Sequence, residues 1–131
     1  MEKVIAYVRR IAKQQGQFKP LFVTDIDGVL VRGPTPVDGT RDAVVKLREA
    51  GIPLACLTNG GGNLERIKND KMNDIFNEDL YDPNLMFMSH SPIRPHLRRF
   101  SSQGGVLLLT GCLSIEDIVD EMGIKNYVIA D

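Results

Sequence analysis

Short apolar runs alternate with helical stretches along this chain, a pattern that predicts a parallel α/β protein. The runs expected to form strands are residues 21–23, 52–57, 85–88, 106–109 and 127–130. Most of them contain few polar residues, as expected for strands that are covered on both faces of a sheet. We therefore predict that these runs form the buried strands of one sheet.

The segments between the runs have helical spacing. In residues 40–50, apolar side chains recur three and four positions apart, Thr40 is placed as the helix cap, and Gly51 supplies a left-handed stop. Further helices are expected at residues 1–18, 63–76, 93–100 and 114–122. The alternation favours right-handed crossovers. It predicts a Rossmann-like parallel sheet with helices on both faces and ligands at the carboxyl ends of the strands.

The length of the chain favours a single domain. A domain of 131 residues buries roughly two thirds of the surface that its unfolded chain exposes, which is enough for one hydrophobic core. We therefore predict one α/β domain over residues 1–131. Its first stretch, residues 1–18, has an apolar stripe beside several basic residues. This fits either a first helix packed on the sheet or an amphipathic mitochondrial presequence; Glu2 and the absence of serine favour the packed helix.

Composition and charge narrow the range of partners. The formal net charge is -1, and acidic and basic residues are mixed along the chain, so we expect no nucleic-acid partner. The longest apolar runs are far too short to cross a bilayer, so we expect no membrane partner. Cys56 and Cys112 lie beside apolar runs and are predicted to be buried thiols in a reducing compartment. This favours an intracellular protein, either mitochondrial or cytoplasmic.

Two carboxylates directly follow the first predicted strand, in the motif Asp25-Ile26-Asp27-Gly28. Alternate residues of an extended segment point to the same side, so Asp25 and Asp27 can face one bound group at the ligand-binding edge of the sheet. Carboxylates this close repel each other unless a hard cation such as Mg²⁺ lies between them or one stays protonated. The alternatives are a polar turn without function and the metal-binding Asp-x-Asp of a sugar-nucleotide transferase.

Groups that can bind an anion follow the second predicted strand. Thr58 presents a hydroxyl, and the backbone amides of Asn59 and Gly60 lie just before a helix. Amides at the N-terminus of a helix attract phosphoryl oxygens, and the helix dipole adds to that attraction. The glycines at 60–62 match neither a P-loop, which needs a lysine, nor a dinucleotide fingerprint. This second strand end therefore predicts an anion site without defining the ligand.

Together these segments resemble the haloacid dehalogenase superfamily. Its first motif is an apolar strand ending in Asp-x-Asp-Gly, and its second motif is a strand ending in Thr or Ser. The fuller match covers residues 25–33, 57–62 and 89–92 and is similar to the class IIA branch of that superfamily. The resemblance implies a magnesium-dependent phosphohydrolase with a Rossmann-like core.

The resemblance also implies a role for each matched residue. Asp25 is the nucleophile toward a phosphate ester of a small metabolite. Asp27 protonates the leaving oxygen and then deprotonates the water that hydrolyses the aspartyl-phosphate. Thr58 is the third catalytic residue and binds the phosphoryl group together with Asn59 and Gly60. Mg²⁺ is held by Asp25 and by the main-chain carbonyl of Asp27.

Two motifs of the superfamily have no match in this sequence. One is a lysine that balances the phosphoryl charge, and the other is an acidic cluster that completes the magnesium shell; both follow a cap domain. Lys125 and Asp131 lie too near the end of the chain to replace them. We therefore expect a truncated haloacid dehalogenase-like core without a complete cap and with little or no turnover alone. The alternative is a non-catalytic binding or interaction module, and an exposed sheet edge also predicts a homodimer.

Histidines and arginines also gather in one segment of the chain. Prolines interrupt the spacing between His90 and His96, which favours structural or solvent-facing roles over metal ligation. Arg94, Arg98 and Arg99 form a basic patch on a predicted helix. We expect that patch to be a solvated face rather than a phosphate clamp.

Overall fold

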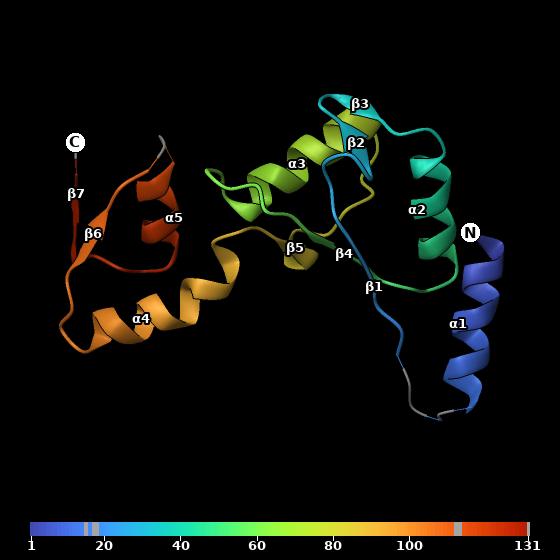
Figure 1. The fold of residues 1–131 in the computed structure, drawn as a ribbon, viewed down its shortest axis with the longest axis horizontal. Coiled ribbons are helices and arrows are strands. Elements are labelled where there is room, and N and C mark those ends of the chain that lie inside the picture. The colour runs from blue at the N-terminus through green and yellow to red at the C-terminus, as the bar shows by residue number, and fades with distance from the viewer. Residues whose placement is uncertain (15, 17–18, 112–113, 131) are drawn as a thin grey trace.

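A computed structural model describes residues 1–14, 16, 19–111 and 114–130 (Figure 1). Predictions for Phe18, Cys112 and Asp131 lie outside these residues. The α-helices are α1 (Glu2–Gln14), α2 (Thr40–Glu49), α3 (Glu65–Phe76), α4 (Arg94–Ser102) and α5 (Ile115–Glu121). The strands are β1 (Phe22–Thr24), β2 (Val31–Arg32), β3 (Thr35–Pro36), β4 (Leu54–Leu57), β5 (Met86–Phe87), β6 (Leu107–Leu109) and β7 (Tyr127–Ile129). The 3₁₀ helices are η1 (Pro83–Leu85) and η2 (Ser91–Ile93).

The first three predicted strands form one parallel sheet in the order β1-β4-β5. Phe22 of β1 pairs with Leu54 of β4, and Cys56 of β4 pairs with Met86 of β5. The predicted parallel α/β fold class is therefore confirmed. Because β1 and β4 are neighbours, their carboxyl ends lie side by side, at the edge where ligands bind in such sheets.

Helices α1, α2 and α3 pack against one face of this sheet. Both crossovers, through α2 and through α3, advance in the same direction along the strand order, and crossovers of one hand then place their helices on the same side. Val44 of α2 and Met72 of α3 accordingly pack in one cluster with Cys56. Val23 and Leu57 point to the other face and are exposed. The sequence predicts helices on both faces, whereas these three helices of the described chain lie on one.

The last two strands form a separate two-stranded sheet near the C-terminus (Figure 1). β6 and β7 pair in parallel, and α5 connects them. Leu107 and Leu109 pack with Val119 of α5 in a cluster that also contains Leu64 and borders Ile67 of α3, while Leu108 is exposed. The sequence predicts these strands but expects them in a single core, whereas the described residues form three clusters. The assignment of residues 1–131 to one domain stays a prediction.

A β-hairpin that the sequence does not predict follows the acidic motif. β2 and β3 pair antiparallel on either side of Gly33 and Pro34. Gly33 has a φ of 59°, a left-handed conformation that favours glycine. The sequence indicates only a turn here because strands of two residues are too short to show an alternating pattern.

The ends of α2 differ partly from the prediction. Gly39, with a φ of 79°, occupies the N-cap position, and Thr40 is instead the buried first residue of the helix. The prediction that Thr40 caps the helix is therefore wrong. Gly51, with a φ of 68°, supplies the left-handed stop as predicted.

The N-terminal helix packs weakly on the molecule. Ile5 of α1 forms a small cluster with Leu47 of α2 and Ile52, while Val4 and Tyr7 of α1 are exposed. This contact supports the interpretation of α1 as a packed helix, and the presequence interpretation stays a prediction. Among the helices described, none has the length and hydropathy needed to span a membrane.

Candidate active site

Asp25 and Asp27 lie in a tight turn directly after β1. Ile26, between them, is 0% exposed, whereas both aspartates are exposed. The carbonyl of Ile26 accepts a hydrogen bond from the amide of Val31 at 3.1 Å, which closes the turn. Gly28 has a φ of 84°, a conformation that glycine adopts without strain. Because Ile26 anchors the turn in the core, the residues before and after it turn outward.

Asp25 has few partners. Its Oδ1 accepts a hydrogen bond from the amide of Ile26 at 2.8 Å. Its Oδ2 has no hydrogen-bond partner in the described part of the chain. The hydroxyl of Thr24 donates to the main-chain carbonyl of Asp25 at 3.0 Å. An exposed carboxylate oxygen at a strand end can act chemically as a nucleophile or as a ligand for a hard cation.

Thr58 brings the end of β4 to Asp27. Its side chain is buried, with the residue only 3% exposed. Its hydroxyl donates to Oδ2 of Asp27 at 3.4 Å and accepts a hydrogen bond from the amide of Gly60 at 3.1 Å. Two of the predicted strand-end groups, Asp27 and Thr58, are therefore in contact across 31 positions of sequence. We call Asp25, Asp27, Thr58, Asn59 and Gly60 the acidic site.

The loop after Thr58 lies against the segment that follows β5. Asn59 is exposed, and the carbonyl of Gly60 accepts a hydrogen bond from the amide of Ser89 at 3.2 Å. A Cβ atom on Gly61 would lie 2.9 Å from Oγ of Ser89, closer than real Cβ contacts allow. The close approach of these two segments thus explains a glycine at 61 and holds the predicted phosphate loop in place.

A residue that the sequence analysis missed lies on the other side of Asp27. The ammonium of Lys68, on the second turn of α3, lies 3.9 Å from Oδ1 of Asp27. A pocket of about 360 Å³ opens beside this pair and is lined by Asp27, Lys68 and Lys71, by Gly33 of the hairpin and by Met72. The sequence carries no signal for this contact because the helix and the hairpin come together only in the tertiary structure.

Cys56 lies two residues before Thr58 and is not a candidate nucleophile. It is 1% exposed in the core. Burial raises the pKa of its thiol to about 12, and the positive charge of Lys68 only partly opposes that shift. The thiol therefore stays protonated at neutral pH, as predicted for a buried structural cysteine.

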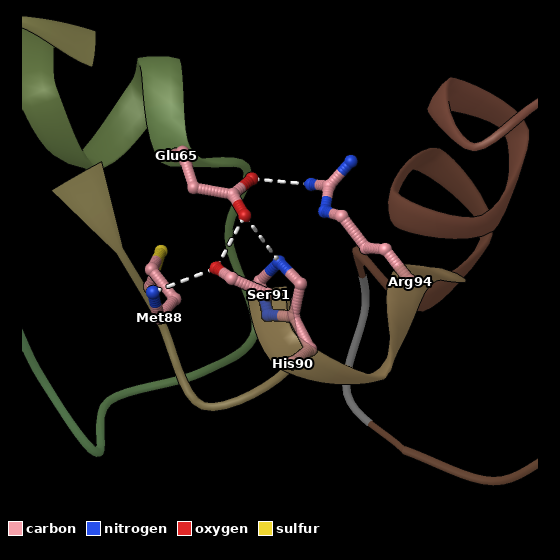
Figure 2. A network of polar contacts seen from close by, with 5 residues as sticks. All are labelled: Glu65, Met88, His90, Ser91 and Arg94. Atoms are coloured by element: carbon pink, nitrogen blue, oxygen red, sulfur yellow. Dashed lines mark hydrogen bonds and ion pairs between the residues drawn. The ribbon is translucent and has the colours of Figure 1, made fainter. Parts of the chain in front are cut away.

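A second polar cluster lies at the start of α3 (Figure 2). Ser91 donates to Oε1 of Glu65 at 2.6 Å and accepts a hydrogen bond from the amide of Met88 at 2.8 Å. Arg94 forms an ion pair with Oε2 of Glu65, and Nε2 of His90 lies 3.4 Å from Oε1. We call these five residues the Glu65 network. It ties the first turn of α3 to η2 and α4, and so fixes one end of the loop that carries Thr58.

The charge of Glu65 is stabilised by its neighbours. Burial alone raises the pKa of its carboxyl. The hydrogen bond from Ser91, a backbone hydrogen bond, the positive charge of Arg94 and the nearby imidazole of His90 together outweigh burial and hold the pKa below its ordinary value. Glu65 is therefore an ionised structural anchor at neutral pH.

The histidines and arginines fall into different roles. The structural role predicted for His90 agrees with its place in the Glu65 network, and His96 is exposed. The predicted solvated face is wrong for Arg94, which pairs with Glu65, but it agrees with the exposure of Arg98 and Arg99. The Nε of Arg98 also donates to the carbonyl of Met122 at 3.0 Å. These long side chains reach across to neighbouring elements, which periodicity within one helix does not show.

The carboxylates of the acidic site can bind a magnesium ion whose remaining ligands are water and substrate phosphate. Within the described ranges, no group of three or more His, Cys, Asp or Glu residues could hold a metal ion. Mg²⁺ in phosphate-transfer sites is bound by one or two carboxylates, with water and substrate phosphate completing its shell. Asp25, with an unpaired oxygen, and Asp27 supply donors of that kind.

Lys125 does not contribute a charge to the acidic site. Its ammonium pairs with Asp120 at 3.2 Å in the β6–α5–β7 unit. The expectation that Lys125 is a poor substitute for the superfamily's lysine agrees with this placement.

Comparison with known proteins identifies the family. The sequence pattern of the haloacid dehalogenase-like hydrolases matches residues 22–125, and the chain belongs to this family. The match contains both β1 with its aspartates and β4 with Thr58. The predicted resemblance is therefore confirmed.

Curated relatives are longer than this chain. A mitochondrial hydrolase of Saccharomyces cerevisiae is 33% identical over 110 residues, which cover 84% of this chain and 30% of the relative. A cardiolipin synthase (CMP-forming) / mitochondrial hydrolase fusion protein of Schizosaccharomyces pombe is 28% identical over 104 residues, which cover 79% of this chain and 17% of the relative. The chain thus spans less than a third of the length of these relatives.

Solved structures share the fold. NagD from E. coli K-12 superimposes with a TM-score of 0.64 at 20% identity and covers 87% of this chain and 46% of its own. A p-nitrophenyl phosphatase from Archaeoglobus fulgidus gives a TM-score of 0.57 at 22% identity, and the match covers 86% of this chain and 41% of the phosphatase chain. At this level of identity the likeness supports the fold alone.

Proposed function

We propose that this chain carries the nucleophile half of a magnesium-dependent phosphohydrolase that acts on a small phosphorylated metabolite. The observation that supports it most directly is the contact between the Thr58 hydroxyl and Asp27 at 3.4 Å, beside an exposed Asp25. The pairing of β1 with β4 brings these groups to the ligand-binding edge of the sheet. Membership of a hydrolase family and fold likeness to a phosphatase agree with this function.

In the proposed reaction, each acidic residue has one task. An oxygen of Asp25 attacks phosphorus, and the bond from phosphorus to the leaving oxygen breaks while Asp27 gives that oxygen a proton. Water then attacks the aspartyl-phosphate, Asp27 takes up its proton, and phosphate leaves with Asp25 regenerated. Asp27 suits both proton transfers because its carboxyl is half exposed, at 56%, and within reach of a bound ligand.

The phosphoryl oxygens need donors and a counter-charge. Thr58 and the amides of Asn59 and Gly60 would bind them at the end of β4, where the Thr58 hydroxyl already accepts from the Gly60 amide. Asp25 and the main-chain carbonyl of Asp27 would hold Mg²⁺, which when bound offsets the negative charge of the phosphoryl group. We expect little or no turnover from this chain alone, because Lys125 and the described carboxylates do not complete such a site.

Beryllofluoride, an analogue of an acyl phosphate, tests the role of Asp25 without needing turnover. We expect the 131-residue chain to give a bound ¹⁹F NMR signal with beryllofluoride and Mg²⁺. Asp25→Asn should abolish that signal, and Asp42→Asn, which changes an exposed residue of α2, should keep it. A wild-type signal that survives Asp25→Asn, or the absence of any signal in the wild type, contradicts the proposed function.

A non-catalytic binding or interaction module is the second candidate. It is favoured by the position of Lys125, which pairs with Asp120 in the β6–α5–β7 unit and adds no counter-charge to the acidic site. Two measurements distinguish the two functions. The hydrolase predicts slow, magnesium-dependent release of p-nitrophenol from p-nitrophenyl phosphate that Asp25→Asn abolishes, or else no turnover together with a beryllofluoride adduct at Asp25. The binding module predicts neither.

We also propose that the chain self-associates and that it acts in mitochondria. β1 lies at an edge of the described three-stranded sheet and contains the exposed Val23, and a second copy can pair with such an edge. Light scattering should show a dimer that Val23→Lys reduces, and a monomer at all concentrations contradicts the association.

The named mitochondrial hydrolase relative supports the proposed mitochondrial location. Fractionation of cells that express the chain tests it, and recovery in the cytosol alone contradicts it.

A further inference from the structure

Lys68 places a positive charge inside a site whose other ionised groups are acidic. It lies on α3, one turn after Glu65, and its side chain is only 21% exposed. A lysine side chain that is largely covered can pack its alkyl stem against the protein while its ammonium stays near an acceptor or water. The carboxylate of Asp27 is the partner within 4 Å that the structure describes.

The contact between Lys68 and Asp27 is a loose one. The separation of 3.9 Å is longer than a hydrogen bond, and Oδ1 of Asp27 faces Lys68 while Oδ2 faces Thr58 at 3.4 Å. An ammonium has three donors, and this contact leaves them free to turn toward another acceptor. The pocket of about 360 Å³ beside the pair gives a ligand access to both side chains.

A phosphate group entering this site adds negative charge next to two aspartates. Charges of one sign at such distances repel strongly in a partly desolvated site, so binding requires a nearby cation in addition to Mg²⁺. Of the lysines that line the pocket, Lys68 contacts Asp27, whereas the exposed Lys71 donates to Oδ1 of Asn63 at 3.4 Å. Lys68 is therefore the better placed of the two.

We infer that Lys68 is a phosphate-binding residue: it turns from Asp27 to a phosphoryl oxygen of the bound ligand. This inference rests on the proposed function, because it assumes that the acidic site binds phosphate. When Lys68 turns away, its contact with Asp27 is released, and Oδ1 of Asp27 is free to face the leaving oxygen. Lys68 then supplies from α3 a positive charge that the sequence analysis did not find.

Inorganic phosphate in the presence of Mg²⁺ is the probe that tests this role. The dissociation constant is measured by ³¹P NMR line broadening for the 131-residue chain and its variants. We expect Lys68→Met to weaken phosphate binding about tenfold or more, because a charge-assisted hydrogen bond is lost. Lys68→Arg should restore most of the affinity. Lys71→Met should have a clearly smaller effect, and Lys125→Met, which breaks the Asp120 pair elsewhere, should leave affinity unchanged.

Each outcome separates this inference from the proposed function. In one outcome, the wild-type protein binds phosphate, Asp25→Asn weakens that binding, and Lys68→Met does not. The role of Lys68 is then overturned and the proposed function stands. If Lys71→Met weakens binding as much as Lys68→Met, general pocket charge rather than Lys68 is responsible, which also overturns the inference. If wild-type protein binds no phosphate with Mg²⁺, both fail. Urea unfolding of Lys68→Met without phosphate shows whether the variant is folded, and Lys68→Arg provides the second, conservative variant.

Discussion

The acidic site and the Glu65 network are both clusters of charged and polar side chains, but their contacts differ. Glu65 is 15% exposed in its side chain and has a hydrogen bond of 2.6 Å from Ser91 together with an ion pair to Arg94. Asp27 is 56% exposed, and its contacts with Thr58 and Lys68 are 3.4 Å and 3.9 Å long. Short, shielded contacts hold the fold together, whereas long contacts at an exposed carboxylate leave it available to a ligand.

The largest effect on stability is expected from Glu65→Gln. The change removes the charge that faces Arg94 and His90, and Arg94 keeps a mostly buried charge with a weaker partner. We expect the free energy of unfolding to fall by about 2 kcal/mol, measured by urea titration. Glu78→Gln, which breaks the more exposed pair with Arg41, should cost less than about 1 kcal/mol. Equal losses in the two variants would remove the distinction between the clusters.

The pH dependence of stability should show the same anchor. The pKa of Glu65 is lowered in the folded state, so its stabilising contribution is present above its unfolded pKa, about 4.3, and is lost as pH falls through the lower folded pKa. The difference in unfolding free energy between wild type and Glu65→Gln should therefore be full at pH 7 and shrink below about pH 4. A difference that grows on acidification would contradict the direction of the shift.

A smaller loss is expected from Thr58→Val. Valine keeps the shape of the buried side chain but leaves the amide of Gly60 without its acceptor. We expect a loss of about 1 kcal/mol of unfolding free energy and weaker phosphate binding. Thr35→Val, on the exposed hairpin strand β3, is the matched control and should be nearly neutral. Unchanged phosphate affinity in Thr58→Val would separate Thr58 from the site.

The smallest effect on stability is expected from Asp27→Asn. Its carboxylate is exposed and its contacts are long, so the free energy of unfolding should change by no more than about 0.5 kcal/mol. The amide cannot protonate a leaving oxygen, so any p-nitrophenyl phosphate turnover should disappear. A loss of stability as large as that of Glu65→Gln would show that Asp27 is a structural residue.

The sequence predicts the parts of the site that depend on one strand and its end. Asp25 and Thr58 are found because carboxyl ends of neighbouring parallel strands meet, and the pairing of β1 with β4 confirms that basis. Lys68 is missed, and Arg94 is wrongly predicted to be solvated, because their contacts depend on how α3 and α4 are rotated and on which segments lie opposite them. The spacing of apolar residues predicts which face of a helix or strand is buried, but it does not predict which residues lie against that face.

The same limit applies to the strands. The apolar runs at β6 and β7 predict extended structure, and the structure confirms it. The runs do not specify their partner, and the two strands pair with each other rather than with β5. Pairing is decided by the length of the connection and by the surfaces that the helices cover, and neither is visible within a single run.

The face of the β1-β4-β5 sheet on which Val23 and Leu57 are exposed links folding to chemistry. A strand that pairs in parallel with the free edge of β1 would end next to Asp25, and a helix leading to it in the opposite direction would cover Val23 and Leu57. Pairing of such a strand would therefore bury exposed apolar side chains and also bring new side chains close to the reacting groups. Thermodynamic coupling of this kind makes affinity for a phosphate ligand and resistance to unfolding rise together.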